Sequence, residues 1–315
     1  PALYESVSAI NKIASSEKES INKLSNSILK DFSLTNKILK LVNSAYFRPA
    51  GGGSISTVSR AVIVMGFEAV RNIAITVLLF EHMQNKANVN QLKEEFLRAN
   101  LAGILGKDVS EKAKMRDLEQ IYICSLFQNL GRLLSQYYFP EESEEIRNIM
   151  AHKPCSEEQA AMQVLGITHE DLGAAIAEQW GFPPLILRSM HRLPSGSIRR
   201  PQTQEDRMQV LSCFANELCD VISAGSPEAR GRDMRKILAR FGDSVPLGEK
   251  DLEETIVRAI DEASDFASVI RINLKNTTFG RQMRQFAQGE GAAEPLPVAG
   301  PQADNDDFGD TLLLP

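Results

Sequence analysis

The chain has 315 residues, which is enough to bury a sizeable core and to form two domains or one domain with an appendage. Hydrophobic residues make up 43% and charged residues 24%, close to the globular average, and the net charge is −6. This balance gives no electrostatic footprint for nucleic acid or for an anionic membrane, so we expect neither as a partner.

Cysteine usage and hydropathy predict a cytoplasmic protein. The four cysteines, Cys124, Cys155, Cys213 and Cys219, form no CxxC pair and no cysteine–histidine spacing of the zinc type, so free thiols are expected. No uncharged apolar run approaches the roughly 18 residues of a membrane span, and no basic-then-apolar leader opens the chain. The first residue is Pro1 rather than Met, which suggests a piece or a processed form of a longer protein.

Apolar residues recur at three- and four-residue intervals through most of the chain, which predicts an all-α fold. Residues 20–43 are expected to form helix, turn, helix, with the break near residues 31–35. The segment RPAGGGSIST follows as a glycine-rich connector that ends at Ser56, a good helix N-cap. No Gly-Lys-Ser/Thr follows these glycines and no predicted strand precedes them, so a flexible connector is favoured over a phosphate-binding loop.

The segment AVIVMGFEAVRNIAITVLLF, residues 61–80, suits a buried strand or a buried helix by periodicity alone. Its length, its polar spacing and Gly66 favour two consecutive helices that are separated at this glycine. Further helices, separated by polar or Gly/Pro breaks, are expected at residues 91–113, 118–138, 141–152, 156–165, 169–180, 183–191, 205–224 and 228–241.

The C-terminal part is expected to begin with one long amphipathic helix over residues 249–274. Its apolar stripe comprises Leu252, Ile256, Ile260, Ala263, Phe266, Ile270 and Leu274. This stripe could pack against the main body or form a dimer or partner seam. From Ala287 the sequence becomes rich in Pro, Gly, Ala and acidic residues, which predicts a disordered linker or tail over 287–315.

Only four histidines are available to a metal or acid–base site: His82, His152, His169 and His191. His82 and His152 are expected to close helices, where a cationic ring suits the helix dipole. His169 and His191 lie in THEDLG and SMHRLP, on either side of WGFPP, and are candidates for a shared site. Glu170 and Asp171 could supply acids there, although the first turn of a helix also favours carboxylates.

Four segments, in this order and spacing, resemble the HDOD family, the HD-related output domains of bacterial signalling proteins. They are ILKLVNSAYF, SISTVSRAVIVMGFEAVRNIAI, SLFQNLGRLL and LGITHEDLGAAIAEQWGFPPLIL. The resemblance covers roughly residues 1–225 and implies an all-α HDOD-like domain there. Within it we expect an N-terminal lobe over 1–115 and an HD-like core over 116–225, followed by a helical extension over 226–286.

HDOD domains are related to HD-type phosphohydrolases, including cyclic-di-GMP phosphodiesterases, which hold divalent ions with histidines and a His-Asp doublet. The resemblance implies that two family histidines are retained as His169 and His191. It places other residue types at five ligand positions, namely Ala99, Gln128, Asn129, Arg192 and Asn216.

These replacements disfavour a catalytic metal. A divalent ion that activates water needs anionic or imidazole ligands, whereas Gln128 and Asn129 offer neutral amides and Arg192 would add a positive charge. We therefore expect no catalytic residue, no bound metal and no other cofactor. The expected vestigial pocket comprises Gln128, Asn129, His169 and His191. Its amides could join helices together or line a small-ligand site, and Gly131 should let a helix or a ligand approach closely.

The resemblance favours a non-catalytic bacterial signalling module that binds other signalling proteins or domains of kinase, receiver or cyclic-di-GMP type. One alternative is an HD-type phosphodiesterase or phosphohydrolase with residual activity that uses His169 and His191. Another is a nucleotide-sensing domain. Nucleic-acid binding through Arg199 and Arg200, or through the face from Arg271 to Arg284, is weaker still, because the chain lacks a basic stripe with interleaved aromatics. Homodimer formation, the partner and the input signal are left open.

Overall fold

Helices form every regular element of the residues that the structure describes, and no strand occurs among them. The computed structural model describes residues 18–29, 32–43, 55–83, 88–115, 118–223, 227–269 and 272–288, with residues 7, 9, 10 and 13. The all-α prediction is confirmed.

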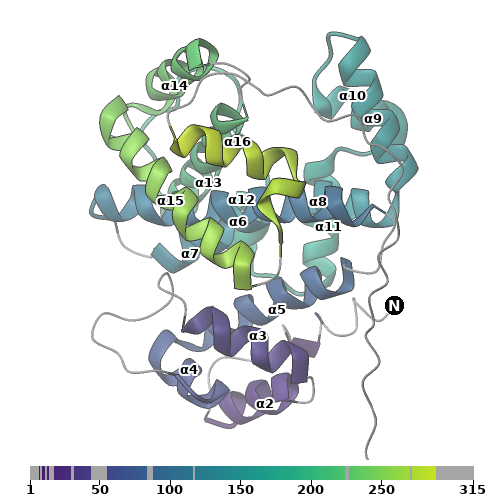
Figure 1. The fold of residues 1–315 in the computed structure, drawn as a ribbon, viewed down its shortest axis with the longest axis vertical. Helices are drawn as coiled ribbons and strands as arrows, with labels where there is room; N and C mark the ends of the chain where they lie inside the picture. Colours follow the sequence, from purple (N-terminus) through teal and green to yellow (C-terminus); the bar gives the residue numbers. More distant parts are fainter. Residues whose placement is uncertain are drawn as a thin grey trace, which may run out of the picture.

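The helices are α2 (Lys18–Leu29), α3 (Phe32–Val42), α4 (Val58–Met65), α5 (Phe67–Met83), α6 (Val89–Lys112), α7 (Leu118–Phe127), α8 (Leu130–Tyr138), α9 (Pro140–His152), α10 (Glu157–Leu165), α11 (His169–Gln179), α12 (Pro184–Ser189), α13 (Gln204–Ile222), α14 (Pro227–Phe241), α15 (Glu249–Val269) and α16 (Thr278–Ala287), with a 3-10 turn η1 (Leu274–Asn276). Figure 1 shows α2, α3 and α4 gathered at one end of the molecule and α9 and α10 at the other. None of the described helices combines the length and apolar character that a membrane crossing requires.

The predicted breaks in the N-terminal part are confirmed where the structure describes them. The helix–turn–helix at 20–43 forms as α2 and α3, and Gly66, with a φ of 94°, separates α4 from α5. The N-cap of α4, however, is Thr57 and not Ser56, because Thr57 Oγ1 accepts from the backbone N of Arg60 at 3.1 Å. The glycines of the preceding connector lie outside the described residues.

Two of the predicted helices are shorter than expected. The single helix predicted over 118–138 is interrupted at Gln128 and Asn129, and α8 starts afresh after Asn129. The long helix predicted over 249–274 ends at Val269. Asn273 and Thr277 then cap η1 and α16 with their side chains, and such local bonds compete with helix continuation. The tail predicted from Ala287 lies outside the described residues from residue 289 onward.

The core is built around α6, which packs against α7, α13 and α15. Phe96 of α6 links both flanks, since its ring lies 4.8 Å from Phe80 of α5 and 6.1 Å from Phe266 of α15, centroid to centroid. The stripe of α15 faces this core, with Leu252 and Ile256 fully buried, so packing against the body is its role in this chain. One apolar cluster extends from the N-terminal helices to α16, and the domain boundary at residue 225 stays a prediction.

Candidate functional site

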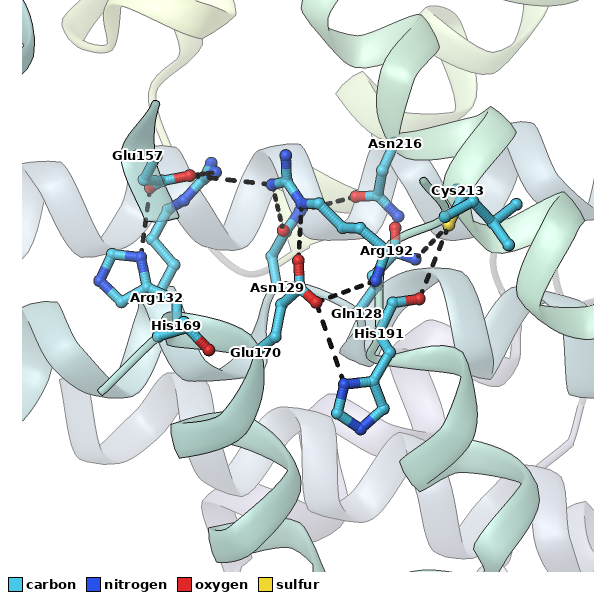
Figure 2. A network of polar contacts seen from close by, with 12 residues as sticks. Gln128, Asn129, Arg132, Glu157, His169, Glu170, His191, Arg192, Cys213 and Asn216 are labelled. Atoms are coloured by element: carbon cyan, nitrogen blue, oxygen red, sulfur yellow. Dashed lines mark hydrogen bonds and ion pairs between the residues drawn. The ribbon is translucent and has the colours of Figure 1, made fainter. Parts of the chain in front are cut away.

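The interruption between α7 and α8 is the centre of the candidate site (Figure 2). Gln128 is buried there, and its Nε2 donates to the backbone oxygen of Ser189 at 3.0 Å and to Cys213 Sγ at 3.1 Å. Gln128 thus ties α7 to the end of α12 and to α13. Burial raises the pKa of the Cys213 thiol to about 11, so this sulfur is neutral near pH 7 and is a poor nucleophile or metal ligand.

Asn129 and Asn216 form an amide pair next to Gln128. Asn216 Nδ2 donates to the backbone oxygens of Ser125 at 3.0 Å and Ser212 at 2.9 Å, which leaves its Oδ1 to accept from Asn129 Nδ2 at 2.7 Å. The remaining oxygen of Asn129 lies 3.5 Å from the guanidinium of Arg192. Every amide group of this pair therefore has a protein partner.

Arg192 points into the site, as Figure 2 shows, although half of its side chain is exposed. Its backbone N–H donates to Glu170 Oε2 at 3.0 Å, and its Nε lies 3.6 Å from Glu170 Oε1. Its Nη2 lies 3.8 Å from Glu157 Oε2. The positive charge of Arg192 is consequently held between two carboxylates at the position where the resemblance implies a histidine.

A second charged group, contributed by α8, α10 and α11, borders the amides. Arg132 Nη2 pairs with Glu157 Oε2, and its Nη1 lies 3.8 Å from Glu95 Oε2 of α6. His169 Nδ1 lies 3.3 Å from the other Glu157 oxygen. Burial raises the pKa of Glu157, but Arg132, His169 and Arg192 together lower it well below its usual range. Glu157 is therefore ionised and is fixed by a cation.

Gly131 brings α8 and α11 into backbone contact. A Cβ at Gly131 would lie 1.7 Å from the backbone oxygen of His169 and 2.8 Å from the backbone N of Gly173. The predicted close approach at Gly131 is confirmed, and the group that approaches is helix α11. This contact places His169 next to the amides of Gln128 and Asn129.

The structure brings three of the four expected pocket residues together. Gln128, Asn129 and His169 line one cavity of about 130 Å³, with Arg132, Glu157, Glu170 and Arg192 as further lining residues. His191 does not line this cavity. Its side chain is 46% exposed, and its ring turns toward Glu170, with Nδ1 3.9 Å from Oε2. Ala99 is buried in α6, and its neighbour Arg98 borders a smaller cavity beside Asn129 and Asn216.

Arg132 and Glu157 are site residues that the sequence reasoning missed. Arg132 stands in the apolar segment LGRLL, and a cation between buried leucines is a signal of an internal partner. The partner itself lies 25 residues away in the chain, at the start of α10, where a carboxylate would be explained by the helix dipole alone.

The groups present do not fit a divalent metal ion. The amide oxygens of Asn129 and Asn216 face donors within the protein, Gln128 is held through its Nε2, and Arg132 and Arg192 place two positive charges beside them. Among the described residues, no three His, Cys, Asp or Glu side chains gather in a way that could hold a metal.

Comparison with known proteins identifies the family. The family model for the HDOD domain matches residues 1–193. The chain belongs to the HDOD family. The HDOD match ends before α13, and the helices from α13 onward lie beyond it.

Solved structures share the fold of this HDOD chain. An HDOD domain protein of unknown function from Geobacter sulfurreducens is 17% identical with a TM-score of 0.60, covering 85% of this chain and 92% of that one. A protein from Shewanella amazonensis, named as an inferred phosphohydrolase, is 16% identical with a TM-score of 0.52. The match covers 91% of this chain and 93% of that one. One from Marinobacter aquaeolei, named as an inferred signal transduction protein, is 19% identical with a TM-score of 0.55, covering 86% and 59%.

An uncharacterized protein from Treponema pallidum is 28% identical to the HDOD chain over 172 residues. The alignment covers 53% of this chain and 33% of that relative, so the chain spans about a third of the relative's length. The likenesses to solved structures establish the fold, and the match to the family model establishes the family.

Proposed function

We propose that this HDOD domain is a non-catalytic bacterial signalling module that acts by binding another signalling protein. The observation that carries the proposal is the set of contacts around Asn129, which donates to Asn216 at 2.7 Å and faces the Arg192 guanidinium at 3.5 Å. A hydrolytic HD-type site needs a carboxylate at this point, to hold a cation and to orient water. An amide bonded to another amide supplies neither function.

The charges around the amides support the same conclusion. Arg132 and Arg192 are each within 4 Å of Glu157, so this carboxylate of the cavity wall already has two cationic partners. A divalent ion would have to displace one of them. His169 and Glu170 alone give too few ligands for a stable site.

The catalytic half of the proposal is tested by metal content and hydrolysis. The full chain is purified without chelators from cultures supplemented with iron, manganese and zinc, and its metal is measured by mass spectrometry. Cyclic di-GMP and bis(nitrophenyl) phosphate are then offered as substrates with each metal. We expect less than stoichiometric metal and no turnover above that of the His169→Ala variant. Stoichiometric metal with turnover that is lost in this variant would establish the phosphohydrolase alternative.

The binding half is tested with defined partners. Kinase, receiver and cyclic-di-GMP domain proteins encoded in the same genome are titrated against the labelled chain, with nucleotides as separate ligands. We expect saturable binding of at least one signalling protein and no nucleotide binding. Saturable binding of a nucleotide alone, without hydrolysis, would favour the nucleotide-sensing alternative.

A further inference from the structure

A separate cavity of about 250 Å³ lies between α5, α6 and α7, and it shares no lining residue with the cavity beside Gln128. Its walls are largely apolar, with Ala69 and Ile73 on α5 and Ile123 on α7. Lys107 and Glu119 also line it. Burial raises the pKa of Glu119 to about 7, so this acid carries only part of a negative charge near neutral pH, and the mainly apolar lining suits an apolar occupant.

Asn72 of α5 is the polar feature of this cavity. The residue is only 5% exposed, and its Oδ1 is fully buried without a hydrogen-bond partner. Its Nδ2 takes part in no hydrogen bond with the residues that the structure describes. A buried polar atom in a native protein is normally bonded, so the buried Oδ1 of Asn72 without a partner indicates a group from outside the chain.

Two neighbouring hydroxyl groups direct their hydrogens away from Asn72. Thr76 Oγ1 donates its hydrogen to the backbone oxygen of Asn72 at 2.8 Å. Tyr122 donates its hydroxyl hydrogen to Asn100 Oδ1 at 2.9 Å. Both side chains line the cavity, but their hydrogens are directed to these acceptors. The side-chain amide of Asn72 is thus left to a ligand or to water.

A second hollow is also lined by Asn72. A wider cleft of about 740 Å³ between the start of α5, α7 and α12 is lined by Asn72, Glu119 and Ile123, which also line the smaller cavity. Figure 1 shows α5 between the α2–α4 group and the helices of the core. The two hollows therefore adjoin at Asn72, Glu119 and Ile123.

We propose that this cavity binds a small, neutral, largely apolar molecule of bicyclic size whose hydrogen-bond donor and acceptor are adjacent, with Asn72 as the residue that recognises both. A cavity of about 150 Å³ accommodates benzene, so the larger space here accommodates two fused rings. A ring lactam matches the Asn72 amide, since its N–H and C=O meet the amide oxygen and nitrogen in one plane. The site would add a small-molecule input to the domain, independent of its partner.

Methyl-labelled NMR of the full chain with carbostyril, a bicyclic lactam, tests this proposal. We expect saturable shifts of the Met65, Ile73 and Ile123 methyl signals, because these side chains line the cavity. N-Methylcarbostyril, which has lost the donor, is expected to bind about tenfold more weakly. Absence of shifts up to the solubility limit of carbostyril, or equal affinity for both compounds, would overturn the proposal.

Two variants test whether Asn72 and this cavity bind the lactam. Asn72→Leu keeps the size of the side chain but removes the amide, and it is expected to bind carbostyril and N-methylcarbostyril equally. Ala69→Phe fills the space and is expected to bind neither. Asn148→Leu, at an exposed position of α9, is the matched control and should retain the tenfold preference. If Asn72→Leu retains this preference, Asn72 does not recognise the ligand; if it fails to fold, the wild-type comparison of the two compounds decides.

Discussion

Each side chain in the Gln128 site has a partner far away in the sequence. Gln128 bonds to Ser189 and Cys213, which are 61 and 85 residues away, and Asn129 bonds to Asn216, which is 87 residues away. Sequence comparison with the family could indicate that these positions had changed from metal ligands to amides. It could not indicate which amide oxygen faces which donor, because that orientation depends on carbonyl groups supplied by other helices.

Replacement of Gln128 with alanine should destabilise the protein. The variant leaves the buried Ser189 carbonyl and the Cys213 thiol without their donor, so we expect the free energy of unfolding to fall by about 1–3 kcal/mol. Urea unfolding monitored by circular dichroism measures the change. Gln163→Ala, at an exposed position of α10, is the control and should change it by about 0.5 kcal/mol or less. A Gln128→Ala variant as stable as this control would show that the amide has no structural role.

Replacement of Glu157 with glutamine should make the free energy of unfolding less dependent on pH in the acidic range. The pKa of Glu157 in the folded state is raised by burial but lowered further by Arg132, so it lies below the value of about 4.3 in the unfolded chain. The carboxylate therefore stabilises the fold above that pH, and this contribution is lost as the pH falls toward the folded-state pKa. We expect Glu157→Gln to cost about 2 kcal/mol at pH 7 and progressively less below about pH 4.

The measurement for Glu157 is urea unfolding at a series of pH values between neutral and acidic. Glu158→Gln is the matched control, because Glu158 also lies in the first turn of α10 but is exposed. Glu158→Gln removes the same helix-dipole contribution but breaks no buried ion pair. We expect it to lower the free energy of unfolding by about 0.3–1 kcal/mol. Parallel stability curves for wild type and Glu157→Gln across the whole pH range would contradict the assignment.

At the scale of elements, periodicity predicted most helices but missed two helix ends. One lies at a contact between distant helices, and the other lies next to local capping side chains. The apolar pattern of 118–138 is continuous, yet the helix is interrupted at Gln128, whose amide bonds across to α12 and α13. The pattern of 249–274 is continuous as well, but the capping side chains of Asn273 and Thr277 start new turns. Gly66 and Gly131 could be interpreted from the sequence, since a glycine among apolar residues indicates a break or a close contact.

A methyl group at Gly131 should separate α8 from α11. Its Cβ would lie 1.7 Å from the backbone oxygen of His169, and backbone cannot move aside as a flexible side chain can. We expect Gly131→Ala to lower the free energy of unfolding by about 3 kcal/mol, at the upper end of overpacking costs. Gly231→Ala is the control: it lies within α14, its Cβ would meet only Arg235 Nη1 at 3.6 Å, and alanine is the better helix former. Thermal melts that rank the two variants in the opposite order would contradict this packing.

For the whole molecule, the C-terminal helices complete the core instead of standing apart from it. The α15 helix covers α6, and Arg258 of α15 lies 3.2 Å from Asp108 of α6. Burial raises the pKa of Asp108, and Arg258 is the group that offsets this effect most. The family match covers residues 1–193, so a chain cut near its end would lose a charge partner and an apolar cover together.

A chain that ends at Ser223 should therefore lose its cooperative fold. It lacks the fully buried Leu252, Ile256 and Ile260 of α15, each of which contributes about 1.5–3 kcal/mol by burial, and the sum rivals the stability of a typical domain. We expect broad urea unfolding and increased binding of a hydrophobic dye relative to the full chain. A chain that ends at Gln288, which removes only the predicted tail, should match the full chain in both measurements. Cooperative unfolding of the shorter chain at the midpoint of the full chain would instead establish residues 226–286 as a separate unit.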